Sequence, residues 1–321
     1  MDININSDTI AIAMAVYNGE AYLREQLDSI VNQTWSNWIL FIRDDGSKDG
    51  SGAILKEYQD KDPEKIVLID DPAVHGGGAM KNFFAILGWV RDHYPEFHYF
   101  MFSDQDDVWL KNKMEICIKT IKEEEKIDNI PLLVHTDLKV VDAKLNVLAE
   151  SFFSYSSQDP HLNSLPRLLM EDTVSGCTTL WNKKLNDQLV LNTEYPVMHD
   201  WWIALTATAL GRIIYINTPT ILYRQHDKNV DGASDQYHSG AYIIHKLKRK
   251  DSVKNKLNRT IKQGKGFLSL YEEKLTPTQI ELLQQFGKLD SVNKLKRIHI
   301  VFKYGFFKQG MKRVAGELWL I

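Results

Sequence analysis

The first 140 residues alternate short apolar runs with stretches of helical periodicity, and this alternation constrains the fold more than any other feature of the chain. Such a pattern is typical of parallel strands that are joined into one sheet by crossover helices. It predicts an α/β protein with a central sheet flanked by helices. The expected strands lie in 9–18, 38–45, 65–70 and 97–107, and the expected helices in 20–32 and 80–94.

After Pro131 the pattern becomes mixed. Turn residues cluster in 231–240, where the sign of the charge also changes, and this predicts a boundary. We therefore divide the chain into a body at 1–235, with halves at about 1–110 and 111–235, and a helical C-terminal region at 236–321. The expected elements of the second half are a strand in 132–143, a strand that enters a helix in 175–185, a helix from His199 or Asp200 to Gly211, and two short strands around Pro219.

Composition narrows the class of protein. Hydrophobic residues make up 44% of the 321 residues and charged residues 25%, as is usual for globular proteins in water. Cys117 and Cys177 are too few for a disulfide framework or a cysteine-based zinc site. We find no signal peptide and no apolar run near the roughly 18 residues of a membrane-spanning helix. We therefore expect a cytoplasmic protein.

The net charge of −3 conceals an uneven distribution. Residues 240–321 contain 18 Lys and Arg against 6 Asp and Glu, a net charge of +12, whereas the other 239 residues contain 21 against 36, a net charge of −15. An acidic body can hold cations, and a basic tail can meet an anionic surface.

The basic tail also carries apolar residues at helical spacing. A basic amphipathic helix with aromatic residues can lie on an anionic membrane, which would place the protein peripherally on the inner face of the cell membrane. A helix that packs on the body, or on a second copy in a homo-oligomer, fits the pattern equally well. We find no nucleic-acid-binding motif and expect no nucleic-acid partner. The residues expected on one apolar face are Leu295, Ile298, Val301, Phe302, Phe306 and Met311.

Polar residues cluster at the expected carboxyl ends of three strands, at 17–18, 44–45 and 104–107. Ligands of open α/β sheets bind beyond these ends, so the three clusters predict one site. Asp104 and Asp106 lie one residue apart, and on an extended strand end their carboxylates point to the same side. There they can share Mg²⁺ or Mn²⁺ with the oxygens of a diphosphate. Taken alone, an Asp-x-Asp triplet is common in surface loops.

Two other polar positions each admit two interpretations. Asp44 and Asp45 can accept hydrogen bonds from a nucleobase or a ribose, or they can form a turn before a helix that Ser47 caps. His226 follows a strand, where it is either structural or a third ligand of a hard metal ion.

The segment "MHDWW" places a carboxylate at an expected helix start. Asp200 either caps this helix, where the helix dipole favours it, or removes a proton from a hydroxyl group as a general base. Trp201 or Trp202 offers a flat face to a sugar ring.

Taken in order, these segments resemble the glycosyltransferases of family 2, which have the GT-A fold. Within that family the chain resembles the rhamnosyltransferase-like branch of bacterial enzymes that build surface polysaccharides. The resemblance covers about residues 8–230 and implies a Rossmann-like mixed central sheet flanked by helices. It is carried by "AVYNGEAYLREQL", "FIRDDGSKDG", "FSDQDDVWLKNK", "SGCTTLWNKKL", "HDWWIALTATALG" and "YRQH".

The resemblance implies roles for individual residues. The family often has Pro where this chain has Ala15. It also often has Arg where this chain has Lys81, and the lysine keeps the positive charge but makes a different contact. The implied catalytic base is Asp200. The implied metal ligands are Asp106, Asp104 and His226. The implied contacts to the nucleotide sugar are Ala15, Tyr17, Asn18, Asp44, Asp45, Lys81, Asn82 and Asp104. The implied contacts to the acceptor are Gly176, His199, Trp201 and Trp202.

The resemblance also implies an inverting, metal-assisted transfer of a sugar to a hydroxyl group of a growing glycan. The expected donor is dTDP-rhamnose, with UDP-linked hexoses as the alternative, and the expected acceptor is a polyprenyl-diphosphate-linked glycan. Two other classes are open. A sugar-nucleotide nucleotidyltransferase would need a Gly-rich basic loop where "YNGEAYLREQL" stands. A non-catalytic sugar-binding module would have no use for a base at Asp200.

Overall fold

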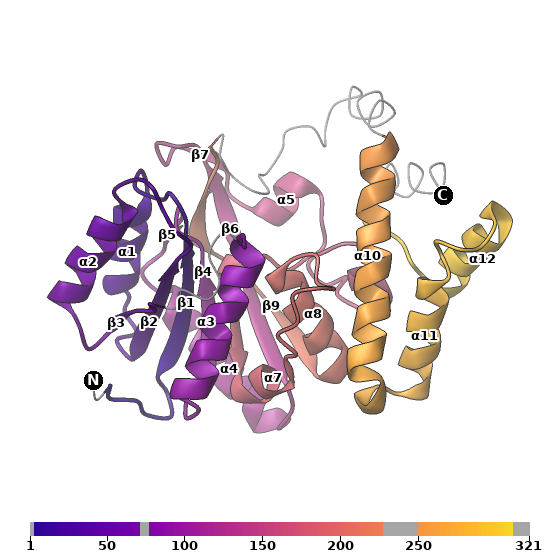
Figure 1. Cartoon of the computed structure of the whole chain (residues 1–321), viewed down its shortest axis with the longest axis horizontal. Helices are drawn as coiled ribbons and strands as arrows, with labels where there is room; N and C mark the ends of the chain where they lie inside the picture. The colour runs from indigo at the N-terminus through magenta and orange to yellow at the C-terminus, as the bar shows by residue number, and fades with distance from the viewer. Residues whose placement is uncertain (1–2, 71–76, 227–249, 311–321) are drawn as a thin grey trace.

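The computed structural model of the protein describes residues 3–70, 77–226 and 250–310. The strands of this part are β1 (Ile10–Val16), β2 (Trp38–Asp44), β3 (Ile66–Leu68), β4 (Tyr99–Ser103), β5 (Val108–Trp109), β6 (Leu132–Val141), β7 (Val147–Ala149), β8 (Thr179–Asn182) and β9 (Arg212–Arg224). They form one mixed sheet in the order β3-β2-β1-β4-β8-β6-β9-β5, with β7 paired to β6 (Figure 1). Strands β1 to β4 are parallel, and β8 is antiparallel to β4 and β6.

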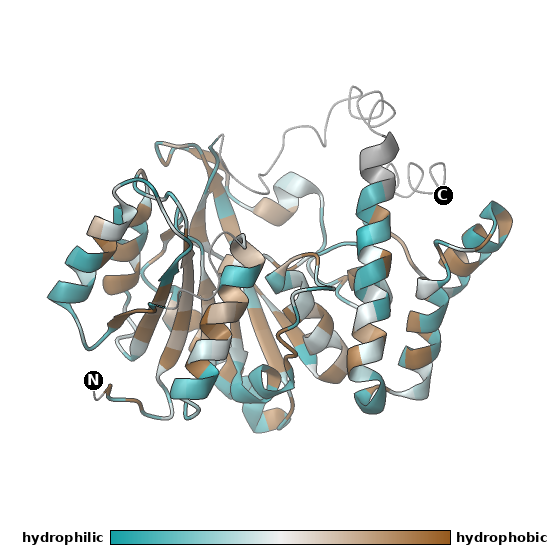
Figure 2. Cartoon of the chain, in the orientation of Figure 1, coloured by the Kyte–Doolittle hydropathy of each residue, from teal (hydrophilic) through white to brown (hydrophobic). Residues whose placement is uncertain are grey.

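Helices cover both faces of the sheet, and strands β1 and β2 are almost wholly apolar (Figure 2). On one face, Ala11 and Ala13 share a core with helices α3 and α8; on the other, Ile10 and Ile12 share a core with α1 and α4. The helices of the described part are α1 (Leu23–Val31), α2 (Ser51–Lys61), α3 (Ala79–His93), α4 (Lys113–Ile127), α5 (Phe152–Ser156), α6 (Leu165–Leu168), α7 (Lys183–Gln188), α8 (His199–Leu210), α10 (Lys250–Tyr271), α11 (Pro277–Gly287) and α12 (Lys294–Tyr304), with 3₁₀ turns η1 (Gly176–Thr178) and η3 (Glu272–Lys274).

The predicted strands and helices of the first half are confirmed, whereas the prediction of two short strands around Pro219 is wrong. Strand β9 runs without interruption through Pro219, parallel to β6. Proline has no N–H to donate, and the register of the two strands shifts where Pro219 lies opposite Asp137. This irregularity lets one long strand contain a residue that usually ends a strand.

The C-terminal helices pack on the body rather than extending away from it. Helix α10 stands beside α8 (Figure 1), and the rings of Phe267 and Tyr271 lie 5.3 and 6.0 Å from that of Trp202. The backbone N–H of Val197 donates to Gln263 Oε1 over 2.7 Å. The described helices therefore continue the core of the body. The predicted boundary at 235/236 lies outside the described residues.

The prediction of one apolar face in the tail is wrong. Val301 is buried, whereas Leu295 and Phe302 are 82% and 59% exposed. Helix α12 ends at Tyr304, and Gly305 takes a φ of 74°, so Phe306 lies beyond the helix and is buried. Met311 lies outside the described residues. No helix in the described ranges is both long and apolar enough to cross a membrane.

Candidate active site

A cleft of about 1340 Å³ opens at the carboxyl ends of β1 and β4. This exceeds the roughly 300–1,000 Å³ of a pocket for one small ligand, so it has room for more than one. The predicted site residues that line it are Ala15, Tyr17, Asp45, Asn82, Asp104, Asp106, Gly176, His199, Asp200 and Trp201. The predicted site residues outside its lining are Asn18, Asp44, Lys81, Trp202 and His226.

The side chain of Gln105 ties the loop after β4 to the loop after β1. Its Oε1 accepts from the N–H of Tyr17 over 2.8 Å, and its Nε2 donates to the carbonyl of Tyr17 over 3.0 Å. Asn18, with a φ of 49°, accepts from the N–H of Lys48. These contacts fix the loops at the ends of neighbouring parallel strands, which is where the sequence predicted one site.

Asp44, one of the predicted nucleotide contacts, stabilises its own turn. Asp44 Oδ1 accepts from both the N–H and the hydroxyl of Ser47, over 2.9 and 2.6 Å. The next helix begins at Ser51, so Ser47 does not cap it. Asp44 therefore shapes the turn, and the carboxylate of this pair that lines the cleft is that of Asp45.

A buried guanidinium lies behind Asp45. Arg43 is 1% exposed; its Nη1 lies 3.4 Å from Asp45 Oδ1 and donates to Asn82 Oδ1 over 2.9 Å. Asn82 in turn donates to the carbonyl of Arg43. This pair of contacts holds α3 against β2 at the edge of the cleft. Lys81, the residue before Asn82 in α3, is exposed to solvent.

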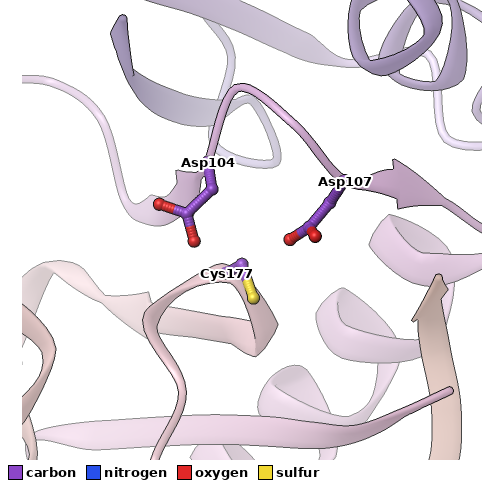
Figure 3. A group of neighbouring side chains, drawn as sticks. All are labelled: Asp104, Asp107 and Cys177. Atoms are coloured by element: carbon purple, nitrogen blue, oxygen red, sulfur yellow. The ribbon is translucent and has the colours of Figure 1, made fainter. Parts of the chain in front are cut away.

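The loop after β4 gathers carboxylates around a thiol. Asp104 and Asp107 lie at the two ends of the loop, close to Cys177 of η1 (Figure 3). One carboxylate oxygen of each aspartate and the sulfur of Cys177 lie within 4.8 Å of one another. In the described part of the chain, this is the group of potential metal ligands that lies close enough together to bind one ion. Asp106 instead contacts His226, with Oδ2 and Nε2 2.9 Å apart. The structure therefore divides the predicted metal set, and Asp107 stands nearer to Asp104 than the sequence suggested.

Arg224, at the end of β9, holds this loop in place. Its Nε donates to the carbonyl of Asp106 over 2.8 Å, and its N–H donates to Asp107 Oδ1 over 3.1 Å. Its guanidinium lies 4.5 Å from the ring of Tyr22, on which His226 stacks at 4.8 Å.

The crowded carboxylates favour protonation in the absence of a cation. Burial, followed by the charges of Asp106 and Asp200, raises the pKa of Asp104 to about 7. Burial and the charges of Asp106 and Asp104 raise the pKa of Asp107 well above its usual range. A nearby cation would favour the ionised carboxylates. Oxygen donors of this kind fit a divalent cation such as Mg²⁺ or Mn²⁺.

Asp200 lines the same cleft from the first turn of α8. Met198 is the N-cap residue, so the interpretation of Asp200 as the cap is wrong. Its Oδ2 accepts from the N–H of Gly176 over 3.0 Å, and its Oδ1 accepts from the N–H of Trp201 over 2.8 Å. A Cβ at Gly176 would lie 3.0 Å from His199 Nε2 and 3.2 Å from Asp200 Oδ2, so a larger residue there would require these side chains to shift. Two N–H groups therefore orient this carboxylate.

The aromatic neighbours of Asp200 are largely buried. Trp202 is 0% exposed and donates to the carbonyl of Val190, so the prediction that it contacts an acceptor is wrong. Trp201 lines the cleft but is only 4% exposed. His199 stacks on Phe83 with ring centroids 4.0 Å apart, and burial lowers the pKa of its imidazole.

The sequence prediction missed a second carboxylate near Asp200. Asp172 lines the same cleft, and its Oδ1 accepts from the N–H of Val174 over 2.9 Å. Burial and then the charge of Asp200 raise the pKa of Asp172 well above its usual range. No periodicity or motif singled out this residue.

Comparison with known proteins adds to this geometry. The sequence model of glycosyl transferase family 2 matches residues 11–184, just over half of the chain. The chain is 30% identical to the dTDP-rhamnosyl transferase RfbG of Shigella flexneri over 255 residues, 77% of this chain and 81% of that protein. It is 28% identical over 109 residues to the UDP-Glc:alpha-D-GlcNAc-diphosphoundecaprenol beta-1,3-glucosyltransferase WfgD of Escherichia coli, 34% of this chain and 39% of that protein. The solved structure of S. aureus TarS 1-349 in complex with UDP-GlcNAc aligns over 93% of both chains, with a TM-score of 0.53 and 16% identity.

Proposed function

Because the chain belongs to glycosyl transferase family 2 and has the GT-A fold, we propose that it transfers rhamnose from dTDP-rhamnose to a hydroxyl group of a growing surface glycan, with inversion of the anomeric carbon. The family and the use of a nucleotide-sugar donor were expected from the motifs, and the comparisons confirm both. The choice of rhamnose is supported by the identity to RfbG. The observation that carries the proposal is that Asp104, Asp106 and Asp200 line one cleft.

The nucleotide sugar is proposed to lie against the ends of β1, β2 and β4. Asp45 is proposed to accept a hydrogen bond from the base or ribose, since its carboxylate lines the cleft whereas Asp44 lies outside the lining. Asp104 and Asp106 would hold Mn²⁺ or Mg²⁺ together with the diphosphate, and His226 orients Asp106. When bound, that cation would neutralise the charge that develops on the leaving diphosphate.

Asp200 is proposed to take the proton of the attacking acceptor hydroxyl. The hydrogen bonds from the N–H groups of Gly176 and Trp201 fix its orientation. As the acceptor oxygen bonds to the anomeric carbon on the face opposite the diphosphate, the bond from that carbon to the diphosphate breaks and the proton passes to Asp200. One such displacement inverts the anomeric centre.

A calorimetric titration tests the donor assignment. We expect dTDP to bind more tightly than UDP, GDP or CMP, and Mn²⁺ to strengthen its binding at least about tenfold, roughly 1.4 kcal/mol. Preference for UDP would indicate a UDP-hexose donor. Binding of dTDP without transfer or hydrolysis of the nucleotide sugar would favour a sugar-binding module. Formation of dTDP-sugar from dTTP and a sugar 1-phosphate would favour a nucleotidyltransferase. Each of these last two results would contradict the proposed transferase function.

We also propose that the acceptor is a polyprenyl-diphosphate-linked glycan and that α12 meets the inner face of the membrane. The similarity to WfgD supports the first part. For the second, Leu295 and Phe302 are exposed seven residues apart, about two helical turns, beside the exposed Lys294, Lys296 and Lys303. Exposed apolar residues flanked by lysines suit an anionic lipid surface.

Changing Leu295 and Phe302 together to serine is expected to weaken binding to phosphatidylglycerol vesicles at least about tenfold, since it removes two apolar side chains from the proposed contact. Sedimentation with vesicles measures this effect. The matched control is Ile127→Ser with Leu148→Ser, which removes two exposed apolar side chains from the body. Equal loss in both double variants, or no loss in either, would contradict a specific role of α12.

A further inference from the structure

The charges that line the cleft come from two separate parts of the chain. Its carboxylates all belong to the body, before residue 226. In the described part of the chain, the lysines and arginines of the lining are Lys256 and Arg259 of α10 and Lys308 after α12. The C-terminal helices therefore contribute the positive side chains of this site as well as packing on the body. The carboxylates of the lining are Asp45, Asp104, Asp106, Glu171, Asp172 and Asp200.

Two hydrogen bonds join α10 to the segment that leads into α8. The N–H of Val197 donates to Gln263 Oε1, and Arg259 Nη2 donates to the carbonyl of Val197 over 3.3 Å. Val197 lines the cleft three residues before Asp200. The guanidinium of Arg259 therefore lies by the segment that leads into α8, the helix that carries Asp200. Lys256 lies one helical turn earlier on α10, and both side chains are exposed.

Lys308 reaches the same cleft from a different direction. The residues on both sides of it are held in place: the carbonyl of Phe307 accepts from Arg167 over 3.0 Å, and the N–H of Gln309 donates to Glu171 Oε2 over 3.0 Å. Glu171 itself lines the cleft next to Asp172. The position of Lys308 is thus set by the wall that carries the acidic residues near Asp200.

We propose that Lys256, Arg259 and Lys308 form an anion subsite at the acceptor end of the cleft, which binds the phosphate groups of an anionic acceptor. The inference rests on the proposed function, because it is the transfer reaction that requires an acceptor there. A cleft lined by six carboxylates repels an anionic substrate. Cations at one place in the cleft offset this repulsion and determine the orientation in which the substrate binds. A guanidinium beside lysine side chains is well suited to phosphate oxygens.

The test measures binding of geranyl diphosphate to the full chain by calorimetry in EDTA, so that no divalent cation bridges it to the aspartates. We expect Lys256→Gln with Arg259→Gln to weaken binding at least about tenfold. The matched control is Lys262→Gln with Lys265→Gln, which removes two charges from the same helix; these lysines pair with Glu194 and Asp290 outside the cleft lining. The control is expected to stay within about twofold of the unmodified protein, and thermal unfolding midpoints verify folding.

Several results separate the sources of the anion. Equal weakening in both double variants would indicate general charge attraction and overturn the subsite. If the cleft variant binds geranyl diphosphate normally but loses binding to phosphatidylglycerol vesicles, these cations meet lipid headgroups and the proposal is wrong. Specific weakening in the cleft variant supports it even if dTDP and UDP fail to bind, in which case the subsite stands and the proposed transferase function falls.

Discussion

Asp200→Asn is expected to lower the rate of sugar transfer by roughly 10²–10⁴-fold, the range associated with loss of a general base. The affinity for the nucleoside diphosphate should stay within about twofold, because the proposed contacts to the nucleotide are made by Asp45, Asp104 and Asp106 and not by Asp200. An asparagine oxygen can accept from only one of the N–H groups of Gly176 and Trp201, so we also expect a loss of about 1 kcal/mol in the free energy of unfolding.

Initial rates at saturating donor, together with calorimetric titration of dTDP, measure these two effects separately. The matched control is Asp187→Asn, a half-exposed carboxylate that pairs with Lys183 on α7. It should leave both the rate and the affinity unchanged. Full transfer activity in Asp200→Asn would exclude this residue as the base, and the neighbouring Asp172 would then be the carboxylate to examine.

Asp106→Asn is expected to abolish the strengthening of nucleotide binding by Mn²⁺, a loss of at least about tenfold in affinity. The reason is that a neutral amide is a much poorer ligand for a hard cation than a carboxylate. Affinity measured in EDTA should not fall. The same titration of dTDP with and without Mn²⁺, carried out on the variant, gives both values.

The group of Asp104, Asp107 and Cys177 in Figure 3 is the alternative site for the metal ion. Asp107 is 1% exposed and lies outside the lining of the cleft, so we expect Asp107→Asn to retain the response to Mn²⁺. Loss of that response in Asp107→Asn but not in Asp106→Asn would move the ion to the site between Asp104, Asp107 and Cys177. The pair of variants thus decides which carboxylate accompanies Asp104.

The first half of the sheet could be predicted because each strand is short and apolar, and the strands expected in 9–18 and 65–70 are followed by helices of clear periodicity. The same argument placed polar residues at the ends of β1, β2 and β4, and the structure brings Tyr17, Asp45, Asp104 and Asp106 of these clusters to one cleft. It failed at β9, where Pro219 indicates a break by its local chemistry alone. Whether a strand tolerates a proline depends on its partner, and here β6 accommodates the shift in register.

Much of what supports the site could not be predicted, because it consists of contacts between residues far apart in the chain. Gln105 holds the backbone of Tyr17, and Arg224 holds that of Asp106. Nothing local in the sequence reveals such partners. The two tryptophans after Asp200 show a different limit: adjacent helical residues point in different directions, and only packing against α10 showed that Trp202 faces the core.

The way α10 packs has a practical consequence for protein engineering. Truncation of the chain after residue 226 would remove Phe267 and Tyr271, which pack on Trp202, and Gln263, which accepts from the N–H of Val197. The shortened body is therefore expected to unfold or aggregate rather than to form a minimal enzyme. Gly266 packs closely against Tyr195, and an added Cβ would lie 2.1 Å from the ring. This contact also restricts the exchange of the C-terminal helices between related proteins. A chimera that contains the C-terminal helices of a relative would therefore also need the segment of that relative that corresponds to residues 195–202.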